Sequence, residues 1–124
     1  MLIEALIWLY FLNALALMLH EIDSAYWNEW KLFNLSGGMN GFLVFNLAAI
    51  VIVLYGFMEI VKATSIGIWF SILLGLIGIF TFGIHMYFIG KGKNEFKVPF
   101  SIAILVSTLV VSIAEIILAV YALM

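Results

Sequence analysis

Residues 2–19 read LIEALIWLYFLNALALML, and residues 20–30, which follow them directly, read HEIDSAYWNEW. The first stretch is almost continuously apolar, whereas the second gathers a histidine, acids and aromatic side chains. About 20 mostly apolar residues suffice to cross a bilayer as a helix. Aromatic residues directly after such a run are typical of the membrane–water interface. We therefore expect a spanning helix over about residues 2–23 and a short interfacial helix over about residues 24–35.

Three further apolar runs follow, at about residues 41–61, 66–89 and 98–122. Of the 124 residues, 67% are hydrophobic and 10% are charged, whereas soluble domains carry about 25% charged residues. Because the runs are continuously apolar rather than alternating, helices are expected and not a β-barrel. The sequence thus predicts an all-α fold, a single integral membrane four-helix bundle over residues 1–124 that makes four passes of the cell membrane.

Four spans place both termini on one side of the membrane, here called the terminal side; the other is the distal side. The distal side is predicted to carry four of the lysines: Lys31, Lys91, Lys93 and Lys97. By the positive-inside rule the distal side is cytoplasmic and both termini are extracytoplasmic. The expected partners are the lipid bilayer and a further copy of the chain. Nucleic acid is not expected as a partner, because the sequence has no basic patch. The absence of cysteine excludes a thiolate metal site and a thiol nucleophile.

Each span carries one narrow stripe of polar or small residues at helical spacing. The stripes contain, in chain order, Asn13, His20 and Asp23; Asn46; Gly78, Thr81 and His85; and Ser101, Thr108, Ser112 and Glu115. Because a polar stripe facing lipid is costly, the four stripes are expected to meet inside the bundle. Its small and hydroxyl-bearing members are ordinary helix-packing residues.

The two histidines are predicted to meet near the distal side. At 1.5 Å rise per residue, His20 and His85 both lie within roughly 6 Å of the distal interface. Asp23 lies one turn beyond His20 on the same helix face. Histidine with carboxylate suits a divalent transition metal, Zn or Fe, with an open position for water or substrate. The sequence therefore predicts a metal site with His20, Asp23 and His85 as ligands, the alternative being two histidines that only form interfacial hydrogen bonds.

Two acids are assigned a catalytic role beside this metal. Glu21 points about 100° away from His20 on the helix, so it is expected at the rim of the site. Glu115 lies too near the terminal side to reach His20 in a straight bundle, and is expected to face Asn13 or a water-filled cavity. Either acid would serve as the general base that activates metal-bound water, making the protein a membrane metalloenzyme. Whether it is an enzyme stays open.

The stretch HEIDSAYW at residues 20–27, followed by Glu29-Trp30, Phe33, Gly37-Gly38 and Gly41-Phe42, resembles a family of uncharacterised small four-span prokaryotic membrane proteins. It is also distantly similar to the HXXEE membrane domain. In that pattern two acids follow a histidine after a two-residue gap; here Asp23 fills the first acid position and Ser24 stands at the second. The resemblance implies a membrane-embedded His/carboxylate site, metallohydrolase-like at most.

Three other functions remain open. Two histidines at equal depth on different spans would suit the axial ligands of a b-type haem. Glu115, an acid inside a span, would suit a small proton- or cation-coupled transporter. The aromatic residues that follow Ser24 would suit a non-catalytic membrane adaptor that docks a partner or lipid headgroups; they are Tyr26, Trp27, Trp30 and Phe33.

Overall fold

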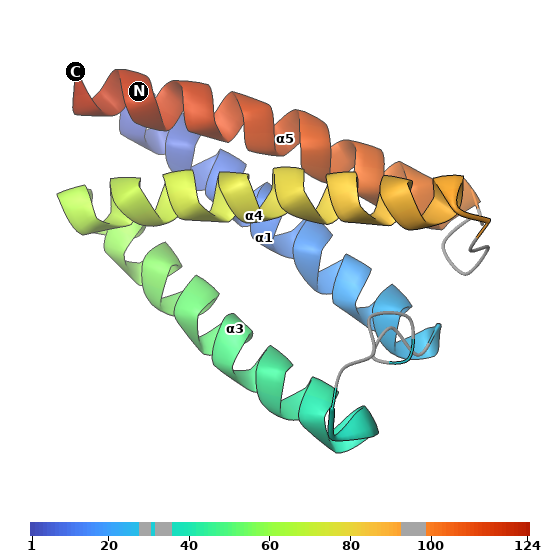
Figure 1. The fold of residues 1–124 in the computed structure, drawn as a ribbon. Coiled ribbons are helices and arrows are strands. Elements are labelled where there is room, and N and C mark those ends of the chain that lie inside the picture. Colours follow the sequence, from blue (N-terminus) through green and yellow to red (C-terminus); the bar gives the residue numbers. More distant parts are fainter. Residues whose placement is uncertain (28–30, 32–35, 93–98) are drawn as a thin grey trace.

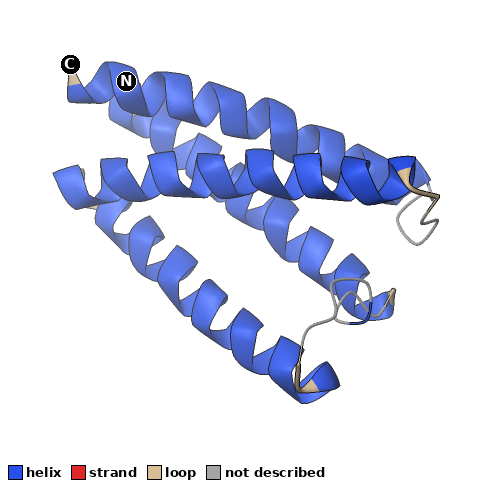
Figure 2. Ribbon diagram, in the orientation of Figure 1, coloured by secondary structure: helices blue, strands red, loops and turns tan. Residues whose placement is uncertain are grey.

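A computed structural model describes residues 1–27, 31, 36–92 and 99–124. These residues form four long helices, which Figure 1 labels: α1 (Leu2–Tyr26), α3 (Gly38–Val61), α4 (Ser65–Gly90) and α5 (Pro99–Leu123). All four are long and apolar enough to cross a membrane. Helix is the only regular secondary structure in the described part of the chain (Figure 2). The predicted all-α class is therefore confirmed, with four helices that are long and apolar enough to span a membrane.

The predicted interfacial helix has a different outcome. Residues 24–26, where it was expected to begin, are the last residues of α1. Most of its remainder, residues 28–30 and 32–35, lies outside the described residues. Two of the aromatic residues in the adaptor hypothesis, Trp30 and Phe33, lie there as well.

Local sequence explains where the central helices begin and end. At the turn between α3 and α4, the Thr64 side chain accepts a hydrogen bond from the Gly67 backbone N–H at 3.0 Å, which caps the start of α4. Ala63, just before it, has a positive φ of 58°, which lets the chain reverse within three residues. At the other end of α3, Gly37 has φ 88°, a conformation that glycine adopts without strain.

The helices do not pack equally. α5 makes its main contacts with α4 and α1, whereas α3 packs chiefly on α4. Both termini lie at one end of the bundle, and α3 diverges from α4 with distance from the turn that joins them (Figure 1). The bundle is therefore closed on the terminal side and more open on the distal side.

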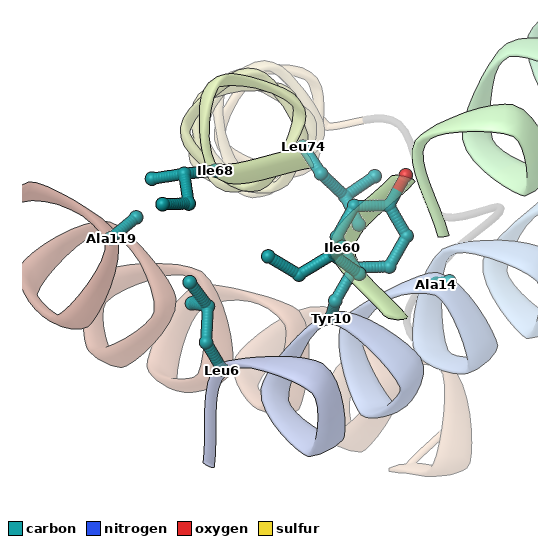
Figure 3. Close-up of a cluster of buried hydrophobic side chains, with 7 residues drawn as sticks. All are labelled: Leu6, Tyr10, Ala14, Ile60, Ile68, Leu74 and Ala119. Atoms are coloured by element: carbon teal, nitrogen blue, oxygen red, sulfur yellow. The ribbon is translucent and has the colours of Figure 1, made fainter. Parts of the chain in front are cut away.

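The hydrophobic core fills the closed part. Its buried members come from all four helices (Figure 3): Leu6, Tyr10, Ala14, Ile60, Ile68, Leu74 and Ala119. Tyr10 packs its ring there and donates its hydroxyl hydrogen to the Val53 carbonyl oxygen at 2.6 Å. This bond satisfies the phenol inside the bundle and joins α1 to α3.

A close approach between α4 and α5 completes the packing. A Cβ added at Gly78 would collide with the Ser112 hydroxyl and lie 3.0 Å from Cγ2 of Thr108. Such small residues let membrane helices approach closely, which is how helices gain packing energy in lipid. The packing role predicted for this stripe is thus realised at Gly78.

Large apolar side chains cover the outside of the bundle, as expected for contact with a lipid bilayer. Exposed Trp and Tyr side chains are found towards both ends: Trp8, Tyr55, Trp69 and Tyr121 on the terminal side, Tyr26 and Tyr87 on the distal side. Two such belts are typical of membrane–water interfaces. The chain is accordingly a multi-pass membrane protein.

Candidate functional site

The distal half of the bundle brings the two histidines into contact. The ring centroids of His20 on α1 and His85 on α4 lie 4.3 Å apart, with the ring planes at 88°. Both side chains are buried, at 1% and 2% exposure. The depth argument from the sequence therefore places them correctly relative to each other.

Hydrogen bonds orient both rings. Nδ1 of His85 lies 2.7 Å from the carbonyl oxygen of Thr81 on the preceding turn. Because a carbonyl only accepts, Nδ1 must carry the hydrogen, and Nε2 of the neutral ring is then an acceptor. Nε2 of His20 lies 3.3 Å from the Ser24 hydroxyl, also one turn away.

The two acids near this pair differ in their surroundings. Oδ1 of Asp23 accepts a hydrogen bond from Nε1 of Trp27 at 2.9 Å, so this carboxylate is held by its own helix. Glu21 lines the same groove as the two histidines. Within the described residues, no group of three or more His, Cys, Asp or Glu side chains could hold a metal ion. The structure thus brings together two of the three predicted ligands.

A groove of about 1050 Å³ opens between α1, α3 and α4. Small-molecule sites usually measure about 300–1000 Å³, so this groove is large enough for a ligand of drug size or above. Its wall is mainly apolar, including Leu17, Phe42, Phe45, Leu74, Ile77 and Phe80. Its polar side chains come mostly from the distal half: His20, Glu21, Asn46, Thr81 and His85. The groove therefore has a mainly apolar wall, with buried polar side chains gathered towards its distal end.

Asn46 is the polar residue whose role the sequence did not reveal. Its side chain is only 8% exposed and lines the groove. Nδ2 donates to the Phe42 carbonyl oxygen at 2.9 Å. Oδ1 is buried and has no hydrogen-bond partner among the described residues. The available signal was an amide in the middle of an apolar span, which costs free energy unless it is bonded.

A second polar cluster lies between α1 and α5. Nδ2 of Asn13 donates to Oε2 of Glu115 at 2.6 Å and to the Ser112 hydroxyl at 3.0 Å. Glu115 is fully buried, and within the described structure its Oε1 has no hydrogen-bond partner. Glu115 is not part of the groove wall. It faces Asn13, one of the two surroundings expected from the sequence, and it lies apart from the histidine pair.

Glu59 does not extend either cluster. Its Oε1 accepts from Nζ of Lys62 at 3.0 Å, and its Oε2 accepts from the Thr64 hydroxyl at 2.9 Å. Lys62 is more than half exposed, so this is an ion pair at a helix end.

Comparison with known proteins adds one result. Residues 6–122 match the model of a family of unknown function, DUF6713. No curated protein matches the chain, and no solved structure does. The match covers nearly the whole bundle, including both polar clusters and the groove.

Proposed function

The chain belongs to the DUF6713 family of unknown function, and we propose that it binds a lipid-soluble amphipathic molecule in the groove between α1, α3 and α4. One observation carries this proposal. The groove combines an apolar wall with buried polar side chains gathered towards its distal end. Ligand sites typically join a mostly apolar wall with a few placed polar groups.

The depth of the groove matches an elongated ligand. On α3 its wall runs from Gly41 to Val53, which is a helix length of about 18 Å. The terminal end of this wall is apolar, with Ala14 on α1 and Leu74 on α4 beside Val53. A molecule with a hydrocarbon tail would lie along the wall and leave its polar head beside the histidines.

Blocking the groove tests the proposal. Ala49 lies in the wall, so Ala49→Trp should fill the space and lower binding of a co-purified lipid-soluble molecule by about tenfold, equal to about 1.4 kcal/mol. Ala103→Trp is the matched control, because Ala103 lies on α5 and is exposed on the outer surface. The bound molecules are extracted from the purified variants and quantified by mass spectrometry. Equal occupancy in the two variants would remove the proposal.

Metal binding by the histidine pair is a second candidate. The contact between the buried rings of His20 and His85 supports it. The predicted metal is Zn or Fe. Metal content after loading with Zn²⁺ or Fe²⁺ should fall in His20→Ala and His85→Ala, and no retained metal in the wild-type protein would exclude it. The same ring contact disfavours a b-type haem, whose iron would have to lie between the two imidazoles.

Proton- or cation-coupled transport through Glu115 is a third candidate, and the fully buried carboxyl beside Asn13 supports it. Proton flux into proteoliposomes should fall in Glu115→Gln and remain in Glu59→Gln, which alters the ion pair with Lys62 at the helix end instead. Equal flux in wild type and Glu115→Gln would exclude this function.

A further inference from the structure

We infer that Glu115 is a proton-binding site, a neutral carboxylic acid that takes up and releases its proton at Oε1 and does not bind an alkali cation. This inference rests on the third candidate function, transport through Glu115, and specifies which species that function would use. The contacts of the two carboxyl oxygens carry it. They lie between α1 and α5, apart from the groove.

The two oxygens of Glu115 have different surroundings. Oε2 accepts a hydrogen bond from Nδ2 of Asn13 at 2.6 Å, so it faces a donor and needs no hydrogen of its own. Oε1 is buried and has no hydrogen-bond partner among the described residues. Because the side chain is 0% exposed, bulk water cannot solvate a charge there. A proton on Oε1 removes the charge and keeps the bond from Asn13.

The lysines of the chain are placed away from this carboxyl. Four of the five stand in the sequence between α1 and α3 or between α4 and α5, which are the distal connections. From Pro99, where α5 begins, to Glu115 the helix rises about 24 Å. Lys62 pairs with Glu59 at the end of α3, a helix that does not contact α5 in the described structure. The chain contains no arginine. An isolated buried carboxylate is so costly that such a group takes up a proton instead.

The ionisable side chains of the neighbouring helices do not supply an alternative site for this proton. α5 packs on α1 and α4. On α1, Tyr10 is close enough to interact electrostatically with Glu115, and its hydroxyl hydrogen is already donated to the backbone of α3. On α4 the ionisable side chains are His85 and Tyr87, both near the distal end of the helix. His20 of α1 is distal as well, where it contacts His85.

The same contacts disfavour an alkali cation. Hard cations are held by several oxygen ligands. Asn13 and Ser112 bond to each other, since Nδ2 donates to the hydroxyl at 3.0 Å and the hydroxyl lies 3.3 Å from Oδ1. Their oxygens are therefore engaged, and the NH₂ group that faces Oε2 is a donor and not a ligand. Gly78 brings α4 directly against the Ser112 hydroxyl, which excludes a hydrated ion there. One open oxygen suffices for a proton but not for a metal cation.

Infrared spectroscopy of the purified protein in detergent, at neutral pH, tests the protonation state. The wild-type protein should show the carbonyl band of a protonated carboxyl, and Glu115→Gln should lose that band. Glu59→Gln is the matched control, because Glu59 is paired with Lys62 and its replacement should remove a carboxylate band instead. The same carboxylic-acid band in the wild type and in Glu115→Gln would overturn the inference.

The wild-type protein provides a measurement that does not depend on a variant folding. Its carboxylic-acid band should fall as the pH is raised, return as the pH is lowered, and stay unchanged when choline chloride is replaced by NaCl or LiCl at constant pH. Absence of the band at neutral pH would overturn the inference. Loss of the band on adding NaCl or LiCl would assign the site to a cation and would overturn it as well.

Flux measurements separate this inference from the transport function. If the band behaves as expected but wild-type proteoliposomes show no proton flux, the inference stands and only the transport function fails. If a flux depends on Glu115 but follows a Na⁺ gradient at constant pH, the transport function stands and the inference fails.

Discussion

Replacing Gly78 with alanine should disrupt the contact on which α4 and α5 depend. The added Cβ would collide with the Ser112 hydroxyl and lie 3.1 Å from the Ser112 Cβ. The hydroxyl cannot simply turn away, since it accepts from Asn13 Nδ2 at 3.0 Å and lies 3.3 Å from Asn13 Oδ1. Either α5 moves outward or these hydrogen bonds break.

The expected loss is about 2 kcal/mol, the middle of the range for overpacking, which is about a 30-fold change in the folding equilibrium. Gly83→Ala makes the same change on the same helix at an exposed position where the added Cβ meets nothing within 4 Å. That control should keep or gain stability, by up to about 1 kcal/mol, because alanine favours the helix. The difference between the two variants therefore isolates the contact.

The free energy of unfolding is measured for both variants by denaturant titration in mixed micelles. Adding Ser112→Ala to Gly78→Ala removes the colliding hydroxyl and should recover about 1 kcal/mol relative to the sum of the single changes. Equal stability of Gly78→Ala and Gly83→Ala would refute the packing argument. Strict additivity of Gly78→Ala and Ser112→Ala would refute the assignment of the clash to that hydroxyl.

Further predictions use the same unfolding measurement. Asn13→Ala and Glu115→Ala should show a coupling free energy of about 0.6–1.7 kcal/mol in a double-mutant cycle, the range of hydrogen bonds between membrane helices; additive losses would contradict the bond. Glu59→Gln should cost no more than about 1 kcal/mol, because its partner Lys62 is exposed, and a loss that salt does not reduce would argue against an ion pair. Tyr10→Phe should cost about 0.5–1.5 kcal/mol through the lost bond to the α3 backbone, and an unchanged stability would contradict that bond.

The sequence was most informative about the depth of each residue in the membrane, because that depth follows from its position along an apolar run. The four apolar runs determine how far each residue lies from the interface, so His20 and His85 could be placed at one level before any contact was known. The same reasoning kept Glu115 away from them and left Asn13 as a neighbour. Both outcomes appear in the structure, as a ring contact and as a 2.6 Å hydrogen bond.

Rotation about the helix axis was harder to predict. Residues three and four apart both share a face with His20, and the structure pairs its ring with Ser24 while Trp27 binds Asp23. The groove could not be predicted either, because α1, α3 and α4 line it together and no single span encodes how they are arranged. Glu21 and Asn46 are both part of its wall.

The divergence of α3 from α4 also means that a small tilt of α3 at one end moves its other end by a much larger distance. The helix is tied to α4 at the short turn by the hydrogen bonds of Thr64, and its opposite end is the one farthest from that pivot (Figure 1). An α3 that runs from Gly38 to Val61 is 24 residues long, about 36 Å, so a tilt of about five degrees at the pivot shifts the far end by about 3 Å. Gly67 lies against the backbone of Glu59 and Ile60 at this turn. A displacement of a few tenths of an ångström there would therefore become a larger change in the width of the groove at Asn46. The distal end of the groove would thus change width more than its terminal end, which lies nearer the pivot.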